Sequence, residues 1–216
     1  MVIYDKHMLN PNIKELINSI PKRITIVAAT KYISKEEFPS LYAVGIKDYG
    51  ENRVDSFLEK YNYLKDYQDV KWHFIGHLQR NKAKQVINKI DCLHSLDSLE
   101  LAKIIGKERI KPLDTFIEVS INLEESKNGV PYYQISGFVK EVLRYRKIHL
   151  VGLMMMAEKG SLNTDEQFHK LREIRDQLER EFNIRLPYLS MGMSDDYQSA
   201  IKEGATHIRL GRILFQ

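Results

Sequence analysis

The sequence has little of what would place it among secreted, fibrous or membrane-spanning proteins. It contains one cysteine, Cys92, which excludes an intrachain disulfide framework and is typical of a reducing compartment. Its 11 glycines and 6 prolines among 216 residues are too few for a collagenous or low-complexity chain. The longest apolar run, at 151–157, is far shorter than the ~20 residues that span a bilayer. The opening segment, MVIYDKHMLNPN, lacks the apolar stretch of a secretory signal, so we expect a cytoplasmic protein.

The charge balance is nearly even, because 33 lysines and arginines face 29 acidic residues, for a net charge of +4. One local excess of positive charge runs from Lys71 to Lys89, a segment without an acidic residue. Two interpretations stay open: a solvated helix face, or a rim that attracts anions. The second would suit a module that binds RNA or an acidic protein, although nucleic-acid binders usually show a denser basic stripe.

Short apolar runs alternate with amphipathic stretches along the chain. We predict eight strands, near 24–29, 46–49, 72–75, 92–95, 115–120, 148–153, 186–189 and 207–210. Each but the last is followed by a predicted helix, which indicates a parallel sheet. The pattern predicts one domain, 1–216, of the α/β class, folded as a (β/α)8 TIM barrel; a doubly wound open sheet is the alternative. In both folds, ligands bind beyond the carboxyl ends of the strands.

Three predicted helices begin with the spacing of a capping box, in which a polar cap is followed three residues later by Glu or Gln. The pairs are Ser34 with Glu37, Asp97 with Glu100, and Thr164 with Gln167. These pairs mark where the chain turns from a strand-end loop into a helix.

Lys31 directly follows the run ITIVAAT, so we place it at the carboxyl end of the first strand. A lysine that emerges from a dry sheet is desolvated, which lowers its pKa and makes its amine a nucleophile toward aldehydes. The alternative is a lysine that extends into solvent from a strand end without a chemical role.

The second and third strand ends carry polar groups. Glu51 and Asn52, in the motif GEN, face the same rim, although Asn52 could instead cap the following helix. In WHFIGHLQRNK, His73 lies within the strand and His77 in the loop, and we interpret His73 as a satisfied core histidine. The histidines and the single cysteine have no metal-ligand spacing, so we expect no metal.

The last two strand ends suggest an anion site. LSMGMSDD places Ser190, Gly192 and Ser194 in a turn before a helix that is predicted to start at Asp195. The run HIRLGR places Arg209 and Gly211 at the end of the eighth strand. Backbone amides at such loops bind phosphate in many barrels. The alternative is that Ser194 is only a helix cap.

A lysine amine and a phosphate site at one barrel mouth fit pyridoxal 5′-phosphate (PLP), which has an aldehyde and a phosphate. At this point the sequence resembles the YggS/PROSC family of pyridoxal phosphate homeostasis proteins, whose barrel is like the N-terminal domain of alanine racemase. The matching stretches run in order over nearly the whole chain: IVAATKYIS, YGENRVDSF, WHFIGHLQRNKAK, LHSLDSLELA, VSINLEESKNGV, LVGLMMMAE, LSMGMSDDYQSAIKEGATHIRLG and RILF.

The resemblance implies a fold-type III PLP barrel in which Lys31 holds PLP as a Schiff base. It implies a phosphate cradle made by Ser194 and the amides of Gly211 and Arg212, with Ser190 and Met191 close by. Arg209 then faces the pyridine nitrogen, and Asn52 lies near the ring. Two residues depart from the family pattern: Arg212 stands where relatives usually have a small residue, and His77 replaces a common proline.

The resemblance, together with the short chain, implies a monomeric PLP carrier in vitamin B6 homeostasis that passes PLP to apo PLP-dependent enzymes, without turnover of its own. An arginine opposite the ring nitrogen makes PLP a weaker electron sink than an aspartate does. A chain of 216 residues also leaves no room for the second domain of the racemases. The alternatives are a PLP-dependent racemase that uses Lys31 as a base, and the RNA- or protein-binding module at 71–89.

Overall fold

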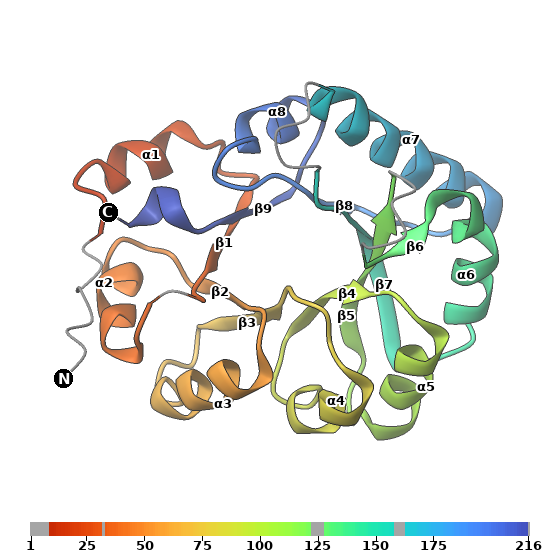
Figure 1. Cartoon of the computed structure of the whole chain (residues 1–216), viewed down its shortest axis with the longest axis horizontal. Helices are drawn as coiled ribbons and strands as arrows, with labels where there is room; N and C mark the ends of the chain where they lie inside the picture. The colour runs from red at the N-terminus through yellow and green to blue at the C-terminus, as the bar shows by residue number, and fades with distance from the viewer. Residues whose placement is uncertain (1–8, 32, 122–127, 158–162, 216) are drawn as a thin grey trace.

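Eight parallel strands close into a barrel, and the helices lie outside it (Figure 1). The structure is a computed structural model, which describes residues 9–31, 33–121, 128–157 and 163–215. In barrel order the strands are β1 (Thr25–Ala29), β2 (Asp48–Glu51), β3 (Lys71–Phe74), β4 (Cys92–Leu96), β5 (Leu113–Ser120), β7 (Ile148–Met154), β8 (Tyr188–Ser190) and β9 (His207–Leu210). The predicted (β/α)8 barrel is confirmed.

The barrel closes where β9 pairs with β1. Thr25 lies opposite His207 and Val27 opposite Arg209, so the first and last strands pair without a shift in register. This parallel pairing rules out the doubly wound open sheet, whose outer strands would not meet. It also places the loops after β8 and β9 beside the end of β1.

All eight predicted strands are present, and two of them, β2 and β8, begin two residues later in the chain than we predicted. The amide of Ile46 bonds to the carbonyl of Leu41, so Ile46 still belongs to the turn that ends a helix. The amide of Leu186 likewise bonds to the Glu179 carboxylate at 2.6 Å. In both places the backbone amide donates to a residue of the preceding helix, so it is not available for a hydrogen bond to a neighbouring strand.

The α-helices are α1 (Ile13–Ser19), α2 (Phe38–Ala43), α3 (Val54–Tyr63), α4 (Arg80–Val86), α5 (Leu99–Glu108), α6 (Ile135–Val142), α7 (Thr164–Phe182) and α8 (Tyr197–Lys202). Short 3-10 turns are η1 (Lys35–Glu37), η2 (Tyr132–Gln134) and η3 (Arg212–Leu214). The longest helix, α7, buries Phe168, Leu171 and Leu178 on one face, and each such side chain stabilises the fold by about 1.5–3 kcal/mol.

Two elements were not predicted: α1 and the two-residue strand β6 (Val130–Pro131), which pairs with β5. Helix α1 buries only Ile13, so its sequence shows little helical periodicity. Its start is held by distant residues, because the Asn10 amide donates to the Leu214 carbonyl at 3.0 Å and Leu9 bridges to Phe215. Because these contacts join residues more than 200 positions apart, the sequence around α1 alone does not predict the helix.

The capping predictions succeeded at one position and failed at two. Ser34 and Glu37 form the predicted box, in which the Ser34 amide donates to the Glu37 carboxylate at 2.6 Å. Helix α5, however, is capped by Ser98, whose hydroxyl accepts from Leu101, and not by Asp97. Asp97 bonds to His77 instead. Helix α7 begins at Thr164 itself, so Thr164 occupies its first turn and is not its cap.

No helix in the described part of the chain is both long enough and apolar enough to cross a membrane.

Candidate functional site

Lys31 lies two residues beyond β1, at the C-terminal mouth of the barrel, where we predicted it. The predicted burial of its amine is wrong, because Lys31 is exposed. The reason lies in its neighbour. Thr30 is fully buried, and its amide donates to the Gly50 carbonyl at 3.0 Å, so the sheet ends at Thr30 and the chain turns outward at Lys31.

The loops after β8 and β9 meet at Ser194. Its hydroxyl oxygen accepts from the amides of Gly211 (3.3 Å) and Ile213 (3.4 Å). These bonds are long for N–H···O bonds, so the hydroxyl and the amides gather without strong bonds to one another. A Cβ placed on Gly211 would lie 3.6 Å from the Cβ of Ala29, so this cluster borders the end of β1.

The turn after β8 requires glycine at 192. Gly192 has φ +94°, and a Cβ there would lie 2.6 Å from the Ala200 Cβ, so any other residue would clash. The backbone therefore demands the glycine that we placed in this turn from the sequence.

Ser194 is not a helix cap, so that alternative is wrong. Helix α8 begins at Tyr197, and Asp196 occupies its N-cap position without a side-chain bond to the helix; its carboxylate accepts instead from the Met193 amide at 2.5 Å. The expected start at Asp195 is therefore two residues early. Burial raises the pKa of Asp196 above its ordinary value.

The Arg212 guanidinium pairs with a carboxylate beside the Ser194 cluster. It donates to the Asp195 carboxylate at 2.5 Å, and both side chains are about two-thirds exposed. The substitution of the usual small residue by arginine thus adds an ion pair at the edge of the mouth. The Arg212 amide remains part of the loop.

Arg209 is buried beneath the mouth with only 4% of its surface exposed. Its guanidinium donates to the Ser190 hydroxyl at 2.6 Å and to the Met155 carbonyl at 2.8 Å. Burial lowers the pKa of Arg209 to about 10, against the attraction of Glu118 and Asp196. The guanidinium therefore stays charged at neutral pH and bonds to uncharged acceptors.

Ser190 and Met191 lie deeper than we predicted. Ser190 is the last residue of β8 and not part of the turn, because its carbonyl and amide belong to the sheet. Both side chains are fully buried, and the Ser190 hydroxyl is used by Arg209 and His94. These two partners of the Ser190 hydroxyl therefore lie inside the barrel and not in the loop at the mouth.

Asn52 follows β2 at the mouth. The N-cap position of the following helix, α3, is occupied by Arg53, which makes no side-chain cap bond, so the alternative in which Asn52 is the cap is wrong. The Oδ1 atom of Asn52 is buried and has no hydrogen-bond partner among the described residues. Gly76 packs directly on Asn52, since a Cβ there would lie 2.6 Å from its backbone oxygen.

Glu51 does not face the rim as we predicted. It is fully buried, and its Oε1 accepts from Lys60 and Thr30, each at 2.5 Å. Lys60 also donates to the Thr30 carbonyl at 2.5 Å. This buried group holds the end of β1 just before Lys31.

The histidines of β3 and β4 meet inside the barrel. His73 is a satisfied core histidine, as predicted: its ring nitrogens bond to His94 and to Asp48, each at 2.9 Å. Sequence reasoning missed His94 entirely. Ligand atoms of His73, His94 and Cys92 all lie within 4.8 Å of one another, a group that sequence spacing did not suggest. The mutual hydrogen bond of the two histidines accounts for their approach.

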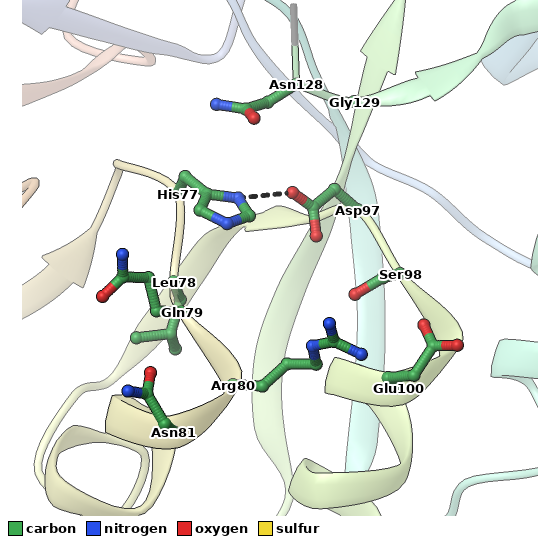
Figure 2. Close-up of a pocket in the computed structure, with 10 residues that line it drawn as sticks. All are labelled: His77, Leu78, Gln79, Arg80, Asn81, Asp97, Ser98, Glu100, Asn128 and Gly129. Atoms are coloured by element: carbon green, nitrogen blue, oxygen red, sulfur yellow. Dashed lines mark hydrogen bonds and ion pairs between the residues drawn. The ribbon is translucent and has the colours of Figure 1, made fainter.

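A polar cavity of about 810 Å³ opens beside the mouth, between the loops that follow β3, β4 and β5 (Figure 2). His77 bonds to Asp97 across it at 2.8 Å, while Arg80 and Glu100 extend into it from α4 and α5. A second cavity of about 410 Å³ includes Asn52 and shares His77 with the first. His77, one of the two residues that depart from the family pattern, therefore lies between the two cavities.

Glu118, near the end of β5, was also missed. Its side chain is 3% exposed, and burial, aided by the charge of Asp97, raises its pKa to about 7 against the opposing effect of Arg209. A buried carboxyl that titrates near neutrality can donate or accept protons. A single glutamate in an apolar strand was the only sequence signal.

The positive segment from Lys71 to Lys89 does not form one surface. Lys71 starts β3, at the opposite end of the barrel from Arg80. Lys82 pairs with Asp55 at 3.1 Å and Lys84 with Glu108 at 2.9 Å. These contacts favour the interpretation of a solvated helix face.

The fold and the mouth define a (β/α)8 barrel of the racemase type, and the family model described as "Alanine racemase, N-terminal domain" matches residues 7–216. The alanine racemase of Corynebacterium glutamicum shares this fold, with a TM-score of 0.72 and 14% identity, over 93% of this chain and 58% of its own.

A curated protein of Aquifex aeolicus, named pyridoxal phosphate homeostasis protein, is 43% identical over 88% of this chain and 85% of its own. The structure of PipY of Synechococcus elongatus solved without PLP is 29% identical and has a TM-score of 0.90, over 97% of this chain and all of PipY. PipY has also been solved with PLP bound, with a TM-score of 0.86, over 95% of this chain and 98% of that one. The chain belongs to the pyridoxal phosphate homeostasis protein family.

Proposed function

We propose that this protein binds PLP at the C-terminal mouth of its barrel and takes part in intracellular PLP homeostasis as a carrier. Lys31 supplies the amine that bonds to the aldehyde carbon. Ser194 and the amides of Gly211 and Arg212 hold the phosphate, and Arg209 faces the ring nitrogen. The relatives' names and the PLP-bound PipY structure support PLP as the ligand.

The observation that carries the proposal is the contact between the two loops and β1. Ser194 gathers the amides of Gly211 and Ile213, and Gly211 borders Ala29, two residues before Lys31. A hydroxyl and converging amides are the donors that phosphate oxygens prefer. The buried Asn52 oxygen without a partner lies at the same mouth and is a place for a ligand donor.

The positions of charge favour a carrier over a catalyst. PLP, when bound, supplies an aldehyde and an electron sink for carbanions. The Arg209 cation disfavours protonation of a nearby ring nitrogen, because two positive charges repel, and this weakens the sink. We extend the proposal to a cytoplasmic monomer that passes PLP to apo PLP-dependent enzymes.

The test is PLP uptake by the purified chain, followed by borohydride reduction and peptide mapping. We expect visible absorbance and modification of the peptide that contains Lys31. Lys31→Ala should lose both signals, while Lys35→Ala, a nearby surface lysine paired with Glu59, should keep them. A colourless wild-type protein with unmodified Lys31 after excess PLP would overturn the proposal.

One observation favours the alternative of a PLP-dependent racemase: Glu118 combines burial with a pKa near 7 beside Arg209. The loaded protein should therefore be incubated with D- and L-amino acids. Sustained turnover that disappears in Lys31→Ala and falls in Glu118→Gln would replace the carrier proposal with an enzyme.

A further inference from the structure

A continuous series of hydrogen bonds runs through the barrel interior from Arg209 to β4 and on through β3 to β2. Its members are Arg209 (β9), Ser190 (β8), His94 (β4), His73 (β3) and Asp48 (β2), which we call the interior network. Successive polar atoms are 2.6, 2.8, 2.9 and 2.9 Å apart. Only Asp48, with a quarter of its side chain exposed, is not buried.

With both histidines neutral, the donor and acceptor chemistry of the two ends determines the direction of every bond between them. The Asp48 carboxylate only accepts, so His73 carries its proton on Nε2. With a neutral His73, its Nδ1 accepts, and His94 must donate from Nε2. The other nitrogen of a neutral His94, Nδ1, then accepts the single hydroxyl proton of Ser190.

The Ser190 oxygen is thereby left to accept from Arg209, which only donates. Each hydrogen bond points from the guanidinium toward the carboxylate. Burial, with His73, His207 and Arg209 nearby, holds the pKa of His94 well below its ordinary value, in agreement with a neutral ring. Phe116 stacks at 4.5 Å from the His94 ring, and this packing restrains the ring.

We propose that His94 and His73 are positioning residues that hold Arg209 through Ser190, both as Nε2–H tautomers. The network restrains the Ser190 hydroxyl, and Ser190 with the Met155 carbonyl restrains the guanidinium. Both acceptors are uncharged, so the positive charge of Arg209 remains available to a ligand. This inference deepens the proposed function and rests on it only for the identity of that ligand.

The first test needs no cofactor. Imidazole ¹⁵N NMR of the full chain at pH 8, above the ordinary histidine pKa, should show His94 and His73 as Nε2–H tautomers. The guanidinium protons of Arg209, assigned through loss of their signals in Arg209→Lys, should show restricted rotation. An Nδ1–H tautomer of His94, or freely rotating Arg209 Nη groups, would overturn the proposal even if PLP binds normally.

The second test compares two substitutions at His94. Asn presents an acceptor near the Nδ1 position, whereas Leu does not, so His94→Asn should keep Arg209 restrained and His94→Leu should release it. In PLP-loaded protein, His94→Leu should shift the absorption maximum and weaken PLP retention at least fivefold. His94→Asn should stay within about twofold of wild type.

His149→Leu is the matched control, because His149 is an exposed histidine that pairs with Asp114 on the barrel surface. It should change neither Arg209 nor the spectrum. If His94→Asn and His94→Leu lose stability and retention equally, with an unshifted spectrum, the role of His94 is only structural and the proposal fails. If His94→Leu does not fold, the wild-type tautomers and His94→Asn still decide it.

Discussion

The Lys60 ammonium lies 2.5 Å from the Glu51 carboxylate, and neither side chain has more than 6% of its surface exposed. The same ammonium donates to the carbonyl of Thr30, the residue before Lys31. A buried ion pair thus connects α3 and β2 to the end of β1. The position of the proposed PLP lysine depends on charges that themselves contact no ligand.

Lys60→Met should lower the free energy of unfolding by about 3–5 kcal/mol, because it leaves the buried Glu51 carboxylate without its cation. The double variant Lys60→Met/Glu51→Gln, in which both charges are gone, should recover most of this loss. Urea unfolding measures both. Lys35→Met, which breaks a surface pair, is the control and should cost less than about 1 kcal/mol. An equal loss of stability in Lys60→Met and Lys35→Met would show that the buried pair contributes no more than the surface pair.

Ser194→Ala should weaken PLP retention by roughly 1–3 kcal/mol, the effect of one lost hydrogen bond to a charged group. Dialysis of loaded protein, followed by absorbance, measures the retained PLP. Ser136→Ala on α6 is the control, since its hydroxyl bonds only at the exposed surface, to Glu181. Unchanged retention in Ser194→Ala would place the phosphate elsewhere.

Arg209→Glu should change the visible spectrum of the loaded protein. A carboxylate favours a protonated ring nitrogen, whereas the guanidinium disfavours it. Because a buried charge reversal can unfold the chain, Arg209→Gln provides a milder variant that removes the cation. Wild-type spectra in both folded variants would show that Arg209 does not face the ring.

Glu118 should make the protein less stable as pH rises from about 4.5 to 7. Its pKa is about 7 in the folded state and near 4.5 when unfolded, so the folded state binds more protons in this range and loses that advantage as the pH rises. We therefore expect the free energy of unfolding of Glu118→Gln, measured relative to that of the wild type, to be higher at pH 8 than at pH 4.5. The expected gain is on the order of 3 kcal/mol.

Urea unfolding of both proteins at pH 4.5 and pH 8 measures this difference. The buried neutral histidines act in the opposite direction, since burial lowers the pKa of His207 to about 3 and acid therefore destabilises both proteins alike. A difference between Glu118→Gln and wild type that does not vary with pH would contradict the raised pKa of Glu118.

Much of the fold was predictable because its signals are local. Alternating apolar runs and helical stripes identified eight strands, and the place of Lys31 followed from the end of one run. The same logic failed at Asp97, where cap spacing matched but Ser98 is the cap. It also failed at Glu51, because the sequence does not show that Lys60 reaches back to it from α3.

The sequence by itself determined the order of strands and helices, and hence which loops lie at the mouth, because burial periodicity is a property of consecutive residues. Only the tertiary structure decided which side chains face one another across the barrel. Ser190 and His94 are 96 positions apart and bond at 2.8 Å. Closure of the barrel brings such residues together. Their contact depends on how distant strands are arranged in space, so the residues next to them in the sequence do not predict it.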